Sequence, residues 1–190
     1  MDPIILRALR ILRGFFTHFE TKPMPDIRAD AIAVYVYRRT AAGIEFLQIH
    51  RSDSTGEYQR SWQTVYGGVE SLPSPPHGKK ETAVQAALRE LREETHLVPI
   101  NMWQVEYLES FYFKPHDYVL VMPVFAVEIN GDEPITLNAE HDAFRWVPEQ
   151  DIPTHFMWRT QREALQYVLE GLRSPSAAAS YLAVDLTKEA

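Results

Sequence analysis

The chain contains no cysteine among its 190 residues. This absence excludes disulfide bridges and thiolate metal sites, and it is compatible with a reducing compartment, so we predict a cytoplasmic protein. Long apolar runs are also missing, because no stretch approaches the roughly 20 residues that span a bilayer. We therefore expect no integral membrane contact.

Basic residues are in deficit, with 19 Lys and Arg against 26 Asp and Glu and a net charge of −7. Such a balance argues against a general nucleic-acid-binding protein. An acidic protein that acts on polyphosphates needs metal ions to offset the repulsion between like charges. Apolar residues make up 45% of the chain, which is typical of a globular domain with a sizeable core.

The clearest helical pattern lies in residues 81–97, where small and apolar residues form one stripe: Ala83, Ala87, Leu88, Leu91 and Thr95. Glu90, Glu93 and Glu94 follow the spacing i, i+3, i+4, so their carboxylates project from one face. Three like charges destabilise a helix unless a positive group lies among them, and Arg89, Arg92 or a divalent cation could supply it. The alternative is an ordinary solvated acidic face.

A glycine turn precedes this helix, in the segment Tyr66-Gly67-Gly68-Val69-Glu70. Two successive glycines allow the backbone to approach a ligand closely. Their carbonyl oxygens could complete a cage of oxygen ligands around a metal held by the acidic helix.

Together these residues resemble the Nudix box, which reads glycine, five residues, Glu, seven residues, Arg-Glu-apolar-x-Glu-Glu-x-Gly-apolar. Glu81 and the segment Arg89-Glu90-Leu91-Arg92-Glu93-Glu94-Thr95-His96-Leu97 match it. Gly68 stands thirteen residues before Glu81 instead of six, which indicates a loop insertion over residues 71–78. His96 replaces the final glycine of the box. Neither departure removes an acidic residue.

The resemblance implies an α/β fold, a Nudix-type α/β/α sandwich with a mixed sheet, and a metal-dependent pyrophosphohydrolase. Its cofactor would be Mg²⁺, with Mn²⁺ as the alternative. The implied metal ligands are Glu90, Glu93, Glu94, the Gly67 carbonyl and Glu140, which precedes a strand. The implied catalytic residues are Glu93, Glu90, Arg89 and Glu140. Glu81 would assist a metal-bound water or cap the helix, and Glu140 has the alternative role of a solvated loop acid.

Two further segments resemble the dihydroneopterin triphosphate pyrophosphatases, which also hydrolyse dATP: residues 62–70 and residues 140–146. The implied substrate is a nucleoside triphosphate or dihydroneopterin triphosphate, cleaved to a monophosphate and pyrophosphate. Candidate substrate-binding residues are Arg51, Trp62, Gln63 and Tyr112. Packing of Trp62 and ordinary surface hydrogen bonds of Arg51 and Gln63 are the alternatives. Other possible functions are a Nudix hydrolase of nucleotide sugars or dinucleotides, and a binding domain without activity.

Three parts of the chain are distinguished by their patterns. Residues 1–25 contain an amphipathic segment over 2–20, which we expect to form an extra N-terminal helix. It would dock on the domain or on a second subunit, as in a homodimer, or else act as a membrane-surface or targeting segment. Residues 26–173 form the predicted Nudix hydrolase domain, and residues 174–190 form a tail without clear periodicity.

Within the predicted domain, alternating apolar residues and turn signals set the expected elements. The pattern predicts helices over residues 81–97 and 153–173. It predicts strands over residues 27–38, 44–50, 61–66, 102–113, 118–129 and 144–147.

Overall fold

The computed structural model describes residues 25–53, 56–70 and 81–189. The expected N-terminal helix and the expected insertion over residues 71–78 lie outside the described residues. Within those residues, no helix is both long and apolar enough to cross a membrane.

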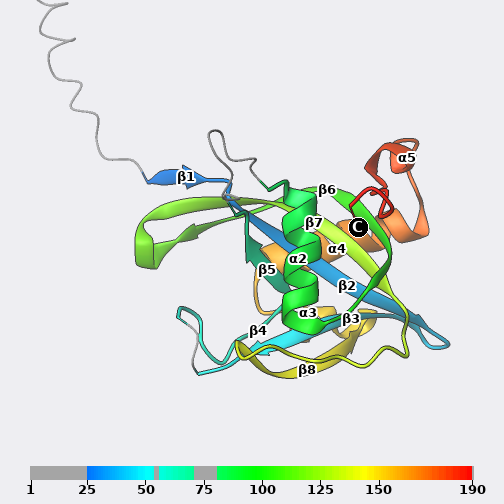
Figure 1. Ribbon diagram of the computed structural model, residues 1–190, viewed down its shortest axis with the longest axis horizontal. Coiled ribbons are helices and arrows are strands. Elements are labelled where there is room, and N and C mark those ends of the chain that lie inside the picture. The colour runs from blue at the N-terminus through cyan, green and yellow to red at the C-terminus, as the bar shows by residue number, and fades with distance from the viewer. Residues whose placement is uncertain (1–24, 54–55, 71–80, 190) are drawn as a thin grey trace, which may run out of the picture.

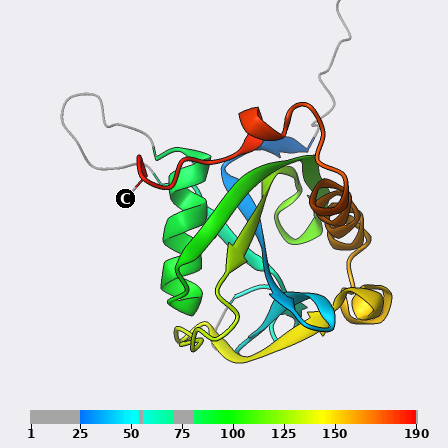
Figure 2. The same ribbon diagram turned by 90° about the vertical axis from the view of Figure 1, so that its right-hand side faces the viewer.

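Among the described residues, an eight-stranded mixed sheet organises the domain. At its centre, β2 (Ala31–Thr40) pairs in parallel with β7 (Tyr118–Ile129) and antiparallel with β3 (Gly43–Arg51). Beyond these strands, β6 (Pro99–Phe113) pairs with β7 and β8 (His141–Pro148) pairs with β3, both antiparallel. Helices cover the two faces of this sheet (Figures 1 and 2). The predicted α/β fold with a mixed sheet is therefore confirmed.

The central strand supplies a separate core to each face of the sheet, because successive side chains of a strand point in opposite directions. Ile32, Val34 and Val36 pack on the side of α2 (Ala83–Thr95), where Leu91 is fully buried. On the other face, three residues pack on the side of α4 (Arg159–Arg173): Ala33, Tyr35 and Tyr37. Burying each large apolar side chain stabilises the fold by about 1.5–3 kcal/mol.

The strands β2 and β3 diverge toward one end, and two short strands fill the fork between them. There, β4 (Trp62–Gln63) pairs with β3 and β5 (Val65–Gly68) pairs with β2. The chain crosses between the two at Thr64, whose buried hydroxyl donates to the carbonyl of Val34. A single strand over residues 61–66 was predicted, and the change of partner explains why there are two.

Two other predicted elements are divided in the structure. The strand expected over residues 27–38 consists of β1 (Asp26–Arg28) and β2, which both pair in parallel with β7. The helix expected over residues 153–173 consists of α3 (Ile152–His155) and α4, separated where Phe156 adopts an extended conformation and is 1% exposed. Short 3₁₀ turns at Lys114–His116 and Glu149–Asp151 follow β6 and β8.

The C-terminal tail packs against the domain, although its sequence shows no clear periodicity. A short helix, α5 (Ala179–Leu182), leads to Ala183, which forms a β-bridge with Trp103 of β6. The N–H of Val184 donates to the carbonyl of Met102 at 2.9 Å. Val184 and Leu186 contact the core on the α2 side of the sheet.

Candidate functional site

Both ends of the acidic helix α2 are capped. The Thr82 hydroxyl accepts a hydrogen bond from the Gln85 N–H, and the Gln85 side chain accepts one from the Thr82 N–H, which forms a capping box. At the other end, His96 takes the left-handed conformation with φ of 60°, where the box has glycine. Nδ1 of His96 lies 2.9 Å from the Thr136 carbonyl oxygen, so a hydrogen bond holds this strained residue.

Arg89 lies at the centre of the acidic residues. Its Nε is 2.9 Å from Glu81 Oε1, and its Nη1 is 2.9 Å from Glu90 Oε1 and 3.1 Å from Glu93 Oε2. Its Nη2 donates to the Gly68 carbonyl at 2.8 Å. One guanidinium therefore neutralises part of the acidic face and ties the glycine turn to the helix.

Glu81 joins the glycine segment to the helix. Its Oε2 accepts a hydrogen bond of 2.9 Å from the Glu70 N–H, and the hydrogen bond from Arg89 lowers its pKa. Because the helix cap is Thr82, the capping role considered for Glu81 is not observed. Its other predicted role, assisting a metal-bound water, stays a prediction.

Glu94 is a buried carboxylate with an unused oxygen. It is 4% exposed, and burial raises its pKa to about 9, with repulsion from Glu90 and Glu140 adding to the shift. Its Oε2 has no hydrogen-bond partner among the described residues. A carboxylate in this state requires a proton or a cation to offset its lost hydration.

The donors on this face fit a hard divalent cation, which prefers carboxylate and carbonyl oxygens. The unpartnered Oε2 of Glu94 is the observation that favours such an ion. In the part of the chain that the structure describes, no three acidic or histidine side chains already converge to hold a metal. Glu90 and Glu93 are turned toward Arg89, so an ion would have to exchange these contacts for its own.

Gly67 allows close contact between the strand β5 and the helix α2. A Cβ atom at this position would lie 2.0 Å from Cγ of Glu90, so the Glu90 side chain would have to move. The same residue lines a cavity on the other side. Gly67 therefore stands between the acidic helix and that cavity.

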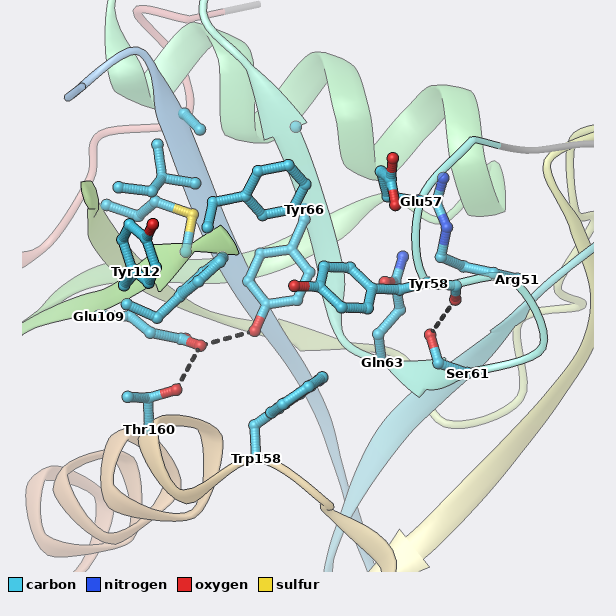
Figure 3. Close-up of a pocket in the computed structure, with 16 residues that line it drawn as sticks. Arg51, Glu57, Tyr58, Ser61, Gln63, Tyr66, Glu109, Tyr112, Trp158 and Thr160 are labelled. Atoms are coloured by element: carbon cyan, nitrogen blue, oxygen red, sulfur yellow. Dashed lines mark hydrogen bonds between the residues drawn. The ribbon is translucent and has the colours of Figure 1, made fainter. Parts of the chain in front are cut away.

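The cavity has a volume of about 380 Å³ and lies at the fork of the sheet, where Figure 3 shows its lining. Of the four predicted substrate-binding residues, Arg51, Gln63 and Tyr112 line it. Six aromatic residues form part of the wall: Tyr58, Tyr66, Phe111, Tyr112, Phe113 and Trp158. The polar lining comes from Arg51, Glu57, Ser61, Gln63, Glu109 and Thr160.

Arg51 stands at the end of β3, where the pairing with β8 changes register. Its Nε is buried and has no hydrogen-bond partner among the described residues. The positive charge of Arg51 lowers the pKa of Glu94 and so offsets part of the rise that burial causes. A cation with an unused donor beside the acidic helix suits an anionic ligand.

Glu140 lies in the turn before β8, close to the end of α2. The Asn138 N–H in this turn donates to the Glu94 carbonyl at 3.3 Å, and the Glu140 carbonyl accepts from the Ser52 N–H at 2.8 Å. Repulsion between Glu140 and Glu94 helps to raise the pKa of Glu94. Glu140 thus lies near the acidic face, and its proposed metal contact stays a prediction.

Comparison with known proteins identifies the family. The model of the NUDIX domain family matches residues 27–168, which is most of the chain. The chain belongs to the Nudix family. The predicted enzyme class, a Nudix pyrophosphohydrolase, is the class that this match supports.

Two solved structures and one further relative are similar to this chain. A Nudix hydrolase structure from Listeria monocytogenes is 25% identical, with a TM-score of 0.61 over 77% of this chain and 95% of that one. An Ap4A hydrolase complex from C. elegans is 21% identical, with a TM-score of 0.60 over 77% and 98% of the two chains, and shows the shared fold. An octanoyltransferase from Myxococcus xanthus is 32% identical over 149 residues. That match covers 76% of this chain but 37% of the relative's length.

Trp62 is the predicted substrate-binding residue that does not line the cavity of the Nudix domain. Its ring lies 4.1 Å from the Arg145 guanidinium and 4.9 Å from the centroid of the His50 ring. These partners come from β8 and β3, so strand pairing creates the packing. The geometry corresponds to the alternative role considered for Trp62, which is packing.

The cavity residues that sequence reasoning did not predict include Tyr58, Glu109, Trp158 and Thr160. Glu109 had a detectable signal, because it is an acidic residue in a strand whose other inward residues are apolar. The signal was missed because the burial of Glu109 depends on distant residues: Tyr66 of β5 and Thr160 of α4 supply hydroxyls to its carboxylate. Tyr58 comes from a loop, and Trp158 and Thr160 come from the start of α4.

Proposed function

We propose that this Nudix domain hydrolyses a nucleoside triphosphate or dihydroneopterin triphosphate and releases the monophosphate and pyrophosphate. One observation carries the proposal: a single cavity joins Gly67 and Arg51, beside the acidic helix, to the aromatic rings of Phe113 and Trp158. A substrate with a polyphosphate at one end and a flat ring at the other matches this arrangement.

Arg51 is the candidate for binding the phosphates. Its unpartnered Nε supplies a donor that would form a charge-assisted hydrogen bond with a phosphate oxygen. Gln63, which also lines the cavity, offers an amide beside it. These two side chains would orient the polyphosphate along the acidic face of α2.

The residues proposed to hold Mg²⁺ are the carboxylates of Glu90, Glu93, Glu94 and Glu140 and the carbonyl of Gly67. Mn²⁺ takes similar oxygen donors and is the alternative. A bound divalent ion neutralises phosphate charge and lowers the pKa of a coordinated water.

Arg89 would act as a positioning residue, since it contacts Glu81, Glu90 and Glu93 at once. Glu93 and Glu140 are both candidates for the general base that takes a proton from the attacking water. Both are accessible, because the Glu93 side chain is 55% exposed and Glu140 lies in an exposed turn. Holding the phosphorus and the water in line is the main contribution that these groups would make.

The alternative is a Nudix hydrolase that cleaves a nucleotide sugar or a dinucleotide. Its products would be two phosphate-bearing molecules without free pyrophosphate, so product analysis separates the two. The predicted cytoplasmic location and homodimer stay proposals, and they do not affect this distinction.

The test is a substrate panel with Mg²⁺, followed by identification of the products. The panel contains GTP, dATP, dihydroneopterin triphosphate, ADP-ribose and a dinucleoside polyphosphate. We expect pyrophosphate and a monophosphate from the first three. Products without pyrophosphate would favour the alternative.

Glu93→Gln tests the proposed chemistry while it keeps the shape of the side chain. We expect kcat to fall on the order of 10³-fold, because several kcal/mol of electrostatic stabilisation would be lost. Glu170→Gln is the matched control, since Glu170 is an exposed residue of α4 away from the cavity. Unchanged turnover in the Glu93 variant would exclude the proposed role of the acidic helix.

A further inference from the structure

A buried carboxylate forms part of the cavity lining, opposite the acidic helix. Glu109 of β6 is 1% exposed, and its Oε1 accepts hydrogen bonds from the hydroxyls of Tyr66 at 2.7 Å and Thr160 at 3.1 Å (Figure 3). Its Oε2 accepts one from the Tyr35 hydroxyl at 2.7 Å. Within the described ranges, no basic side chain forms an ion pair with it.

Glu109 retains unused capacity to accept a hydrogen bond. A carboxylate has about four acceptor sites, and three hydroxyl donors leave one site on Oε2. Each of the three hydroxyls already donates its single hydrogen to Glu109, so none of them can supply a donor for the remaining site. A ligand N–H in the cavity would supply the missing donor.

A second tyrosine–glutamate pair in the same sheet provides a comparison. The Tyr37 hydroxyl donates to Glu128 Oε2 at 3.1 Å, and the Arg39 Nε forms an ion pair with Glu128 Oε1 at 2.8 Å. That pair lies outside the cavity lining. The chain therefore pairs a carboxylate with a cation at one place, and at the cavity it supplies hydroxyls alone.

The rings beside Glu109 suit a flat ligand. The Tyr58 ring makes edge contacts with Phe113 at 5.5 Å and with Trp158 at 5.6 Å between centroids. Tyr58 has a φ of 57°, a conformation that is costly for a tyrosine and is maintained here by surrounding contacts. A planar ring among these side chains would direct one polar edge toward the carboxylate.

We propose that Glu109 selects substrates whose ring carries an amino group next to a ring N–H, the edge shared by guanine and dihydropterin. Both groups on that edge are donors. One would occupy the free site on Oε2, and the other would replace the Thr160 hydroxyl, whose 3.1 Å hydrogen bond to Oε1 is the longest of the three. In adenine, the ring nitrogen beside the amino group carries a lone pair instead of a hydrogen. This lone pair would face a carboxylate oxygen, and two acceptors repel each other. This inference rests on the proposed function, because it assigns the base end of the same substrate.

The experiment measures equilibrium binding of GMP, IMP and AMP to the full chain without added metal. IMP lacks only the 2-amino group of GMP. We expect the wild-type chain to prefer GMP over IMP by about tenfold or more, as one hydrogen bond to a charged group predicts. The Glu109→Gln variant should lose most of that preference, and Glu128→Gln should keep it.

The wild-type measurement is decisive even if Glu109→Gln does not fold. Equal affinity for GMP and IMP, tighter binding of AMP than GMP, or no binding of any of them would overturn the inference. Pyrophosphate release from triphosphates without a preference for GMP would leave the proposed function intact and exclude the role of Glu109. A preference for GMP without any pyrophosphate release would support the role of Glu109 and exclude the proposed function.

Discussion

Two buried carboxylates of this domain meet opposite surroundings. Glu94 on α2 is 4% exposed and Glu109 on β6 is 1% exposed, and burial raises the pKa of both. Glu109 receives three hydroxyl hydrogen bonds, whereas Oε2 of Glu94 has no partner among the described residues. Hydroxyl donors stabilise the buried carboxylate of Glu109. The carboxylate of Glu94 lies among other acids with an oxygen that accepts no hydrogen bond, so it requires added positive charge.

The difference indicates that Glu94 is suited to a cation and Glu109 to a neutral hydrogen-bond donor. The acidic face of α2 already contains Arg89, whose ion pairs join it to Glu81, Glu90 and Glu93. Glu94 is therefore where an added cation would gain most. At Glu109 an added cation would gain less, and a neutral N–H donor is sufficient.

The largest expected effect comes from Glu94→Gln. We expect kcat to fall on the order of 10³-fold, because an acidic metal ligand is removed, while the metal-free protein keeps or gains stability. Thermal unfolding with and without Mg²⁺ checks this, since Mg²⁺ should stabilise the wild type alone. A clear loss of metal-free stability would show that Glu94 is already satisfied and would remove the contrast with Glu109.

Gly67→Ala tests the close packing at the residue that lies between the acidic helix and the cavity lined by Glu109. The added Cβ would overlap Glu90, so we expect a loss of about 1–3 kcal/mol in unfolding free energy and a strong loss of activity. Gly68→Ala is the matched control, because its Cβ would meet the Asp30 carbonyl oxygen at 3.9 Å, an ordinary contact. Equal effects of the two changes in urea unfolding would contradict the close packing at Gly67.

The pH dependence of stability isolates Glu109. Its pKa in the folded chain is raised above 4.5, so the folded state binds more protons than the unfolded state in that window. The unfolding free energy from this group therefore falls as the pH rises above about 4.5. Relative to the wild type, Glu109→Gln should show a shallower decrease in urea unfolding from pH 4.5 to 7, and parallel profiles would refute this.

The smallest effect is expected at the end of α2, where His96 has a φ of 60°. His96→Gly relieves strain of roughly 1 kcal/mol but removes the hydrogen bond to the Thr136 carbonyl, so the net change should stay within about 1 kcal/mol. His96→Val should destabilise by about 1–2 kcal/mol more, because a β-branched residue is strained at positive φ. Equal stability of the two variants would argue against the left-handed cap.

Local patterns made the acidic helix predictable. The i, i+3, i+4 spacing of Glu90, Glu93 and Glu94 determines a shared face, and the helix α2 lies within the predicted residues 81–97. The strand predicted over residues 118–129 is observed for the same reason, since its apolar run is a local pattern.

Features that depend on distant contacts were not predictable. The ring of Trp62 is covered by Arg145, which is brought there only when β8 pairs with β3. The break at Phe156 depends on the burial of that ring in the core beside α4. The surroundings of Glu109 depend on Tyr66 of β5 and Thr160 of α4, which lie far from it in the sequence.

The bridge between Ala183 and Trp103 means that the family match and the folding unit have different limits. The match ends at residue 168, yet the segment after α5 covers backbone of β6 and contacts the core beside α2. A chain shortened to the matched residues would keep every acid of the box and expose a strand edge next to apolar side chains. We expect such a fragment to self-associate through this edge, which the C-terminal segment covers in the full chain.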